Sequence, residues 1–191
     1  MKSIIIIQFF IISVITVYSQ DISLVEKIFP TDSGEIKYQE VVNVDSTLTA
    51  TQLYLRGKSW IAEEFNSAQD VIQMDEDNKL IVKAYLKKGH NSMVQNPQTW
   101  FTLKLEVKEG KYRYTLTDIR YEYDATISNI TKHTEENFST WLKYSDHQNR
   151  NRREKLNKAW EEYAVGVDLL FTEIINDLKK AMEIDASNDE W

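Results

Sequence analysis

The sequence predicts an α+β domain in which both helices cover one face of an antiparallel sheet. Runs of alternating apolar residues predict strands, and short turns join them. Two longer stretches repeat apolar residues every three or four positions, as helices with one buried side do. The predicted order is strand, helix, four strands, helix. An antiparallel sheet can be covered on one face and meet water on the other.

The first 19 residues have the pattern of a signal peptide that is cleaved during export. Lys2 supplies the positive start, residues 4–17 are almost all apolar, and Ser19 precedes the expected cleavage point. The run is short for a membrane span, which needs about 20 apolar residues. An uncleaved N-terminal anchor is the alternative. We therefore expect an exported protein, periplasmic or secreted, that is soluble after cleavage and has no transmembrane span.

The composition excludes several kinds of site and partner. The 191 residues include no cysteine, so the chain has no disulfide, no thiolate metal ligand and no cysteine nucleophile. The formal net charge is −7. An acidic chain is more soluble, and it disfavours nucleic acid or an anionic membrane as a partner.

A turn and a helix cap organise the first predicted elements. The turn at 31–34 leads into a strand over residues 36–44. Residues 49–52 (Thr-Ala-Thr-Gln) then have the form of a capping box, in which Thr49 and Gln52 bond each other's backbone. Apolar residues at helical spacing follow and predict the buried face of a helix: Leu53, Gly57, Trp60, Ile61 and Phe65.

The middle of the chain predicts four strands. Residues 71–74 and 80–86 flank an acidic turn at 75–78. After a polar loop over 89–97, the clearest hairpin runs from 101 to 116. Its buried residues alternate on both sides of a turn at Glu109-Gly110: Phe101, Leu103, Leu105, Val107, Tyr112, Tyr114 and Leu116.

The apolar alternation changes phase after Leu116, because the next apolar residues are Ile119, Tyr121 and Tyr123. A bulge near Thr117-Asp118 explains this shift.

The last part of the chain predicts a polar connection over 124–151 and a long amphipathic helix over 152–182. The apolar residues of this helix recur every three or four positions: Leu156, Trp160, Tyr163, Val167, Leu170, Ile174, Leu178 and Met182. The expected domain plan is a signal peptide (1–19), an N-terminal linker (20–27), the sheet with the first helix (28–123), the polar connection, the long helix and an acidic tail (183–191).

Several short motifs together resemble one known family. They are Phe29-Pro30, Glu40-Val41-Val42, Leu53-Tyr54-x-Arg56, Asp70-Val71-Ile72-Gln73, Phe101-Thr102-Leu103 and Gly110-x-Tyr112-Arg113-Tyr114. In this order they resemble the domain-of-unknown-function 4468 family over residues 28–123. The resemblance implies a curved sheet like that of the TATA-binding protein (TBP-like) and exported proteins of Bacteroidetes-type bacteria. It supplies no catalytic residues.

The chain departs from this family at Val82-Lys83-Ala84, where the family often has Gly-Lys-Gly. The name of the fold does not imply DNA binding here, because fold alone does not transmit function. A DNA-bending saddle needs a basic face with apolar wedges. The predicted open face instead mixes polar residues with both signs of charge: Lys37, Gln39, Lys104, Glu106, Arg113 and Thr115.

No motif in the sequence predicts catalysis, a metal or a cofactor. G-x-S-x-G, phosphate-loop and H-E-x-x-H patterns are missing from it. His90, His133 and His147 are expected to be solvated loop residues, since none has a second histidine at ligand spacing. The acidic turn at 75–78 begins like a calcium loop, but Lys79 and Leu80 occupy positions that such a loop needs for a ligand and a glycine.

The adjacent pairs Glu63-Glu64 and Glu161-Glu162 are predicted to be solvated rather than an acid–base pair, because neighbouring helical residues diverge.

Trp100 and Tyr85 are the main candidates for ligand binding, because both have the opposite parity from the buried residues of their strands. They predict an exposed aromatic platform for a glycan or a peptide. Partial burial at a sheet edge is the alternative. Arg113 and Lys104 are predicted on the same open face and complete this candidate set.

A basic run at the start of the long helix is a candidate contact for an anion: Arg150, Arg152 and Arg153. Basic residues at a helix N-terminus oppose the helix dipole. The alternative is a solvated face paired with Glu154, Glu161 and Glu162.

These patterns predict a non-catalytic exported domain that binds or scaffolds a protein or glycan component of the cell envelope. The binding surface would be the open sheet face or the polar loop over 89–97. The alternative is an envelope hydrolase whose carboxylates come from distant strands, an arrangement that no linear motif would reveal.

Overall fold

The computed structural model describes residues 24–65, 71–76, 78–86, 95–127, 130–140, 142 and 154–183. The predicted signal peptide lies outside the described residues. So do residues 89–94 of the predicted polar loop, the basic run from Arg150 to Arg153, and the tail from residue 184. Within the described parts, no helix has the length and apolar character needed to cross a membrane.

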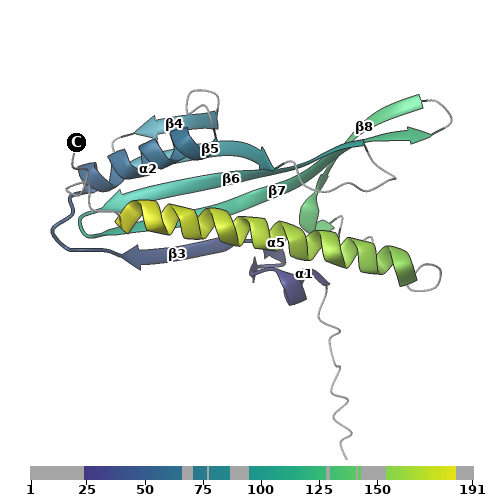
Figure 1. Cartoon of the computed structure of the whole chain (residues 1–191), viewed down its shortest axis with the longest axis horizontal. Helices are drawn as coiled ribbons and strands as arrows, with labels where there is room; N and C mark the ends of the chain where they lie inside the picture. Colours follow the sequence, from purple (N-terminus) through teal and green to yellow (C-terminus); the bar gives the residue numbers. More distant parts are fainter. Residues whose placement is uncertain are drawn as a thin grey trace, which may run out of the picture.

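The sheet has six strands, all paired antiparallel, in the order β3-β7-β6-β5-β4, with β8 also pairing with β7 (Figure 1). The strands are β3 (Tyr38–Asn43), β4 (Ile72–Glu76), β5 (Lys79–Leu86), β6 (Gln95–Lys108), β7 (Lys111–Ile127) and β8 (Ile130–Asn137). One edge of the long strand β7 pairs with β6. Its other edge pairs first with β3 and then with β8.

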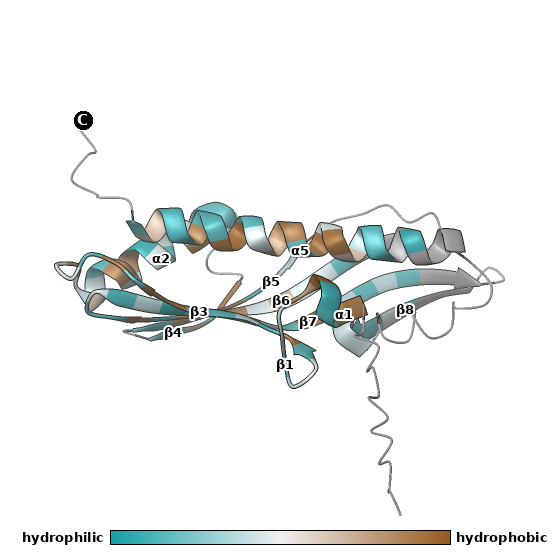
Figure 2. Cartoon of the chain, turned by 90° about the horizontal axis from the view of Figure 1, so that it is seen from below, coloured by the Kyte–Doolittle hydropathy of each residue, from teal (hydrophilic) through white to brown (hydrophobic). Residues whose placement is uncertain are grey.

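Two helices lie on the same side of this sheet (Figure 2). They are α2 (Ala50–Glu64) and α5 (Glu154–Glu183). This arrangement confirms the predicted α+β class with both helices on one face.

The predicted capping box opens α2. Thr49 Oγ1 accepts a hydrogen bond from the Gln52 amide at 3.2 Å, and Gln52 Oε1 accepts one from the Thr49 amide at 2.9 Å. Leu53, Gly57, Trp60 and Ile61 are buried as expected, and Phe65 packs against the core at the end of the helix.

The core lies between the sheet and the two helices. The alternating residues of the predicted hairpin are buried, with exposures of 5% or less. On α5 the described buried residues include Ala164, Val167, Phe171, Ile174, Leu178 and Met182. Val82 and Ala84, at the positions where the resembling family often has glycine, point into this core. Their side chains therefore fill space beneath the helices.

Tyr38 and Arg56 make polar contacts that connect α5 to the rest of the fold. Tyr38 on β3 donates a hydrogen bond to Asp168 Oδ1 at 2.6 Å. Arg56 on α2 donates to the carbonyl oxygen of Met182 at 2.8 Å, near the C-terminal end of α5. A cation at this end satisfies a carbonyl that has no partner within the helix.

The bulge predicted in β7 is present. Thr102 pairs with Thr117 and Trp100 pairs with Arg120, so β7 has one residue more than β6 over this interval. Asp118 lies in the bulge with φ 53°. Because of the extra residue, Ile119 and Tyr121 point to the same core as Leu116.

The structure differs from the sequence prediction in the segments that precede strand β3. Helix α1 (Leu24–Ile28) begins inside the range predicted as a linker, and its Val25 is fully buried. The predicted strand over 36–44 is divided, because a small ribbon of β1 (Thr31–Asp32) and β2 (Glu35–Ile36) precedes β3. The division lies at Lys37, whose amide bonds the carbonyl of Pro30 at 2.9 Å.

The interpretation of residues 124–151 as a polar connection was wrong for its first half. β7 continues to Ile127 and returns as β8, and this long hairpin extends away from the helices (Figure 1). Phe138 and Leu142 follow β8 and are fully buried. The chain therefore returns to the core before α5 begins.

Candidate binding surface on the open sheet face

The face of the sheet opposite the helices carries the predicted polar residues. Lys104 and Glu106 on β6 lie opposite Thr115 and Arg113 on β7, and Gln39 on β3 lies opposite Thr115. On β6 and β7 their neighbours in sequence are buried under the helices, so these side chains point to the other face. Lys37 is bound at the margin of this face by Asp32, at 2.8 Å.

Two of the predicted binding residues, Lys104 and Arg113, meet at Glu106. The Glu106 Oε2 atom lies 2.7 Å from Arg113 Nη2, 2.9 Å from Arg113 Nε and 3.2 Å from Lys104 Nζ. Burial alone would raise the pKa of Glu106. The hydrogen bonds from Arg113 and Lys104 outweigh this effect and hold the pKa below its usual value. Glu106 therefore stays ionised and fixes the Arg113 guanidinium over the sheet.

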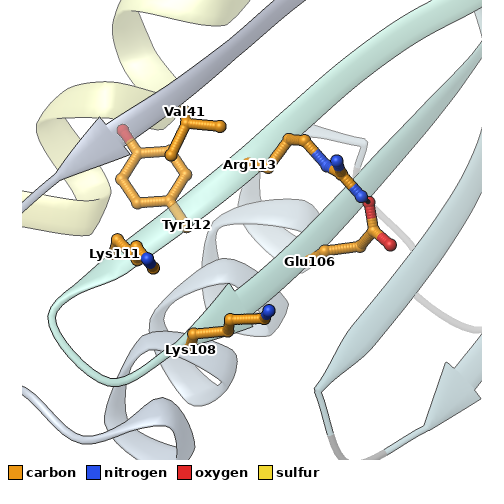
Figure 3. Close-up of a pocket in the computed structure, with 6 residues that line it drawn as sticks. All are labelled: Val41, Glu106, Lys108, Lys111, Tyr112 and Arg113. Atoms are coloured by element: carbon orange, nitrogen blue, oxygen red, sulfur yellow. Dashed lines mark hydrogen bonds and ion pairs between the residues drawn. The ribbon is translucent and has the colours of Figure 1, made fainter.

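A hollow of about 290 Å³ opens beside this cluster. Its lining residues come from the ends of β3, β6 and β7: Val41, Glu106, Lys108, Lys111, Tyr112 and Arg113 (Figure 3). Lys108 and Lys111 are exposed and lie opposite each other, on either side of the turn at Glu109-Gly110. The sequence patterns described above did not point to either lysine. The predicted two-residue turn was a usable signal, because it makes its flanking residues partners.

The other two predicted binding residues, Trp100 and Tyr85, form an aromatic pair. They are opposite each other on β6 and β5, and their ring centroids are 4.7 Å apart. Tyr85 is 39% exposed and Trp100 is half-buried. The Trp100 Nε1 donor is buried and has no hydrogen-bond partner among the residues that the structure describes. The pair is therefore partly a packed contact and partly an exposed aromatic edge.

The aromatic pair and the hollow are separate places on one face. Trp100 and Glu106 are six positions apart along β6, which corresponds to about 20 Å at the rise of a strand. Lys83, Thr102 and Thr117 lie between them on three neighbouring strands.

Beyond the aromatic pair, acidic residues predominate. Glu122 and Asp124 lie on the outer part of β7, and Glu135 lies on β8. The side chain of Arg120 forms an ion pair with Glu135. His133 lies in β8 rather than in a loop, so its predicted setting was wrong. Its Nδ1 atom is 3.1 Å from Asp124 Oδ1. The described open face is therefore basic near the β6–β7 turn and acidic toward β8.

A second hollow, of about 310 Å³, lies at the margin where the small ribbon meets the bulge. Its lining residues are Asp32, Glu35, Ile36, Lys37, Thr117, Asp118, Ile119, Asn137 and Ser139. Internal contacts occupy its polar groups, since Asp32 pairs with Lys37 and Asn137 donates to Glu35 at 3.1 Å.

Asp32, Glu35 and Asp118 line the second hollow together, but the hydrogen bond from Lys37 holds the pKa of Asp32 below its usual value. Glu64 has a raised pKa, caused first by burial and then by the nearby Asp177 and Glu173. Glu64 lies at the end of α2 on the helical side. Asp75, in the acidic turn, contacts Lys58 at 2.7 Å and also accepts from Tyr54. Nowhere in the described ranges do three histidine or acidic side chains gather as metal ligands would.

The predicted anion contact at Arg150, Arg152 and Arg153 lies outside the described residues. The neighbouring Lys158 is described and lies 3.9 Å from Glu162, one turn further along α5.

Two solved structures are similar to this chain. A TBP-like protein from Parabacteroides distasonis superposes with a TM-score of 0.58 and 13% sequence identity, over 84% of this chain and 98% of that protein. A DUF4468 family protein from Bacteroides ovatus superposes with a TM-score of 0.56 and 12% identity, over 84% of this chain and 94% of that protein. No curated protein matches the sequence. At these identities the likeness shows the fold alone.

A family match agrees with this fold. The family described as "Domain of unknown function (DUF4468) with TBP-like fold" matches residues 38–122, from the start of β3 to the second half of β7. The match begins later than the predicted resemblance, which started at residue 28. The chain therefore resembles the DUF4468 family over residues 38–122 and has its TBP-like fold.

Proposed function

We propose that this chain is a non-catalytic, exported domain that binds a protein or glycan component of the cell envelope through its open sheet face. The proposal rests on one observation. The four predicted binding residues, Trp100, Tyr85, Arg113 and Lys104, all lie on the face opposite α2 and α5. They form an aromatic pair and a cation cluster, which are two kinds of contact that recognise ligands.

The electrostatics of this face support binding rather than acid–base chemistry. Glu106 has a lowered pKa and is bound by two cations, so it is a poor proton donor near neutral pH. The basic and acidic regions lie at opposite ends of the face, so a ligand with separated charges would bind in one direction. The described carboxyl groups give no support to the hydrolase alternative.

Export is the second part of the proposal, and the sequence of residues 1–19 supports it. N-terminal sequencing of the protein recovered from the envelope or the medium tests it. We expect the chain to start at Gln20. A recovered chain that starts at Met1 would contradict cleavage.

Site-specific cross-linking tests the binding surface. A photoreactive residue at Thr102, between the aromatic pair and the cation cluster, should capture an envelope component in intact cells. The matched control is the same residue at Leu169, which is 60% exposed on α5. We expect a product from position 102 that Arg113→Ala or Trp100→Ala weakens. Capture at position 169 alone, or capture at 102 that neither substitution changes, would exclude the open face as the binding surface.

A further inference from the structure

Two lysines that make no ion pair with any described residue lie opposite each other at the end of the open face. Lys108 and Lys111 are directly paired across the β6–β7 turn, so their Cβ atoms are expected about 4.5–5.5 Å apart. Like charges in this position destabilise a sheet. Within the described parts of the chain, neither lysine makes an ion pair. An anion between them would remove the repulsion.

The surroundings add to this preference. Lys108, Lys111 and Arg113 line the same hollow, and Glu106 is the only carboxylate among the described residues that line it. Glu106 already accepts from Arg113 and Lys104. The hollow therefore has an excess of positive charge in a chain whose net charge is −7. This local sign is opposite to that of the whole protein.

We infer that this basic hollow is an anion-binding subsite that takes a carboxylate or phosphate group of the ligand. The inference rests on the proposed function and deepens it by naming the chemistry of the group that is bound. One anionic group can accept hydrogen bonds from both ammonium groups at once, because the two lysines are adjacent partners. Glu106 holds the Arg113 guanidinium at the wall of the hollow (Figure 3).

The shape of the hollow indicates what else the ligand has near its charge. Val41 lines it and is 54% exposed, so an apolar group beside the anion can be buried there. A volume of about 290 Å³ is at the small end for ligand sites, which favours a single charged group over a whole folded partner.

NMR titration of the ¹⁵N-labelled chain, after removal of residues 1–19, tests the subsite. The probes are inorganic phosphate and citrate, each added at constant ionic strength with sodium chloride as the balancing salt. We expect saturable shifts of the amides of Gly110, Lys111 and Arg113. Comparison of the two probes separates a preference for phosphate from one for carboxylate. Shifts spread over all surface lysines, or no saturation with either probe, would overturn the inference.

The double variant K108Q/K111Q supplies the specific test, and K83Q supplies its control. Lys83 is exposed on the same face, and its partner Thr102 is six residues of β6 away from Lys108. We expect the double variant to bind at least tenfold more weakly and K83Q to bind as the wild type does. Equal weakening in both would show a general charge effect, and unchanged binding in the double variant would exclude the hollow.

The two proposals can fail separately. If the titration fails while the cross-link at position 102 persists and depends on Trp100, the anion subsite is wrong and the open-face function stands. The ¹⁵N spectrum of each variant also reports whether it is folded, so loss of binding is distinguished from loss of structure.

Discussion

Gly57 on α2 lies directly against Leu105 on β6, so that a Cβ atom at position 57 would overlap with Leu105 Cδ2. Leu105 is 1% exposed and has little room to move away. This glycine sets how closely α2 approaches the sheet.

We therefore predict that Gly57→Ala destabilises the protein by up to about 2 kcal/mol, measured by urea unfolding. Alanine in a helix interior gains about 1 kcal/mol over glycine, but overpacking a core costs about 1–3 kcal/mol. In an L105A background the obstruction is gone, so the same substitution should be neutral or stabilising. A destabilisation of equal size in both backgrounds would contradict the packing explanation.

Tyr38→Phe should lower the free energy of unfolding by about 1.5–3 kcal/mol. The Tyr38 hydroxyl is the donor in a short hydrogen bond to Asp168, and removing a bond to a charged group costs about this much. Asp168→Asn is the matched change, and the double variant should lose little more than either single one. Additive losses would show that the two side chains act independently.

The bulge residue Asp118 has a positive φ, and a β-branched side chain fits that conformation poorly. Asp118→Val should therefore cost about 1–3 kcal/mol of stability, whereas Asp118→Asn should cost less than about 1 kcal/mol. Asparagine keeps a side-chain oxygen that can accept from Thr102 and valine has none, so loss of this contact adds to the cost of Asp118→Val. Equal thermal stability of the two variants would refute a strained backbone here.

Lys111→Glu should stabilise the ligand-free protein while it weakens the binding of anions. The substitution replaces a repulsive cross-strand pair with Lys108 by an attractive one, which is worth about 0.2–1 kcal/mol relative to neutral residues. Thermal unfolding at low ionic strength measures the gain, and added salt should reduce it. A destabilised variant would show that Lys111 has another role in the fold.

Alkaline pH should destabilise the protein through its buried tyrosines. Burial raises the pKa of Tyr38, Tyr112, Tyr114 and Tyr121, and hydrogen bonds to Asp168 and Glu40 add to the effect for Tyr38 and Tyr114. The folded chain therefore keeps protons that the unfolded chain loses above about pH 10. Stability is complete below that pH and falls as the pH rises through and above it.

Urea unfolding from about pH 8 to about pH 11, with phenolate absorbance recorded in parallel, measures this effect. The absorbance of the buried tyrosines should appear together with unfolding. Complete ionisation of every tyrosine in a chain that remains folded would contradict the prediction.

The sequence predicted those parts of the fold in which local pattern and burial agree. The capping-box residues Thr49 and Gln52 predicted the start of α2, and the phase change after Leu116 predicted the bulge at Asp118. The strand β8 was missed because its residues, such as His133 and Glu135, alternate between polar types on both faces. Its hydrogen bonds to β7 define it, and no apolar periodicity reports those bonds.

The candidate site was predicted only in part, because the alternation of a strand reports the face on which a side chain lies but not its contacts. Strand parity placed Tyr85, Trp100, Lys104 and Arg113 on the open face. Parity could not show that Glu106 binds both cations, because the rotamers of long side chains decide that contact.

The contacts of the fold differ widely in sequence separation, which predicts the order in which its parts form. The hairpin of β6 and β7 closes over only Glu109 and Gly110, whereas Tyr114 meets Glu40 across 74 residues and Arg56 meets Met182 across 126. Each distant contact must first overcome the entropy of a large loop. We therefore expect the β6–β7 hairpin to act as the nucleus on which β3 and then α5 assemble late. The basic turn between these two strands would be among the first parts of the molecule to reach its native form.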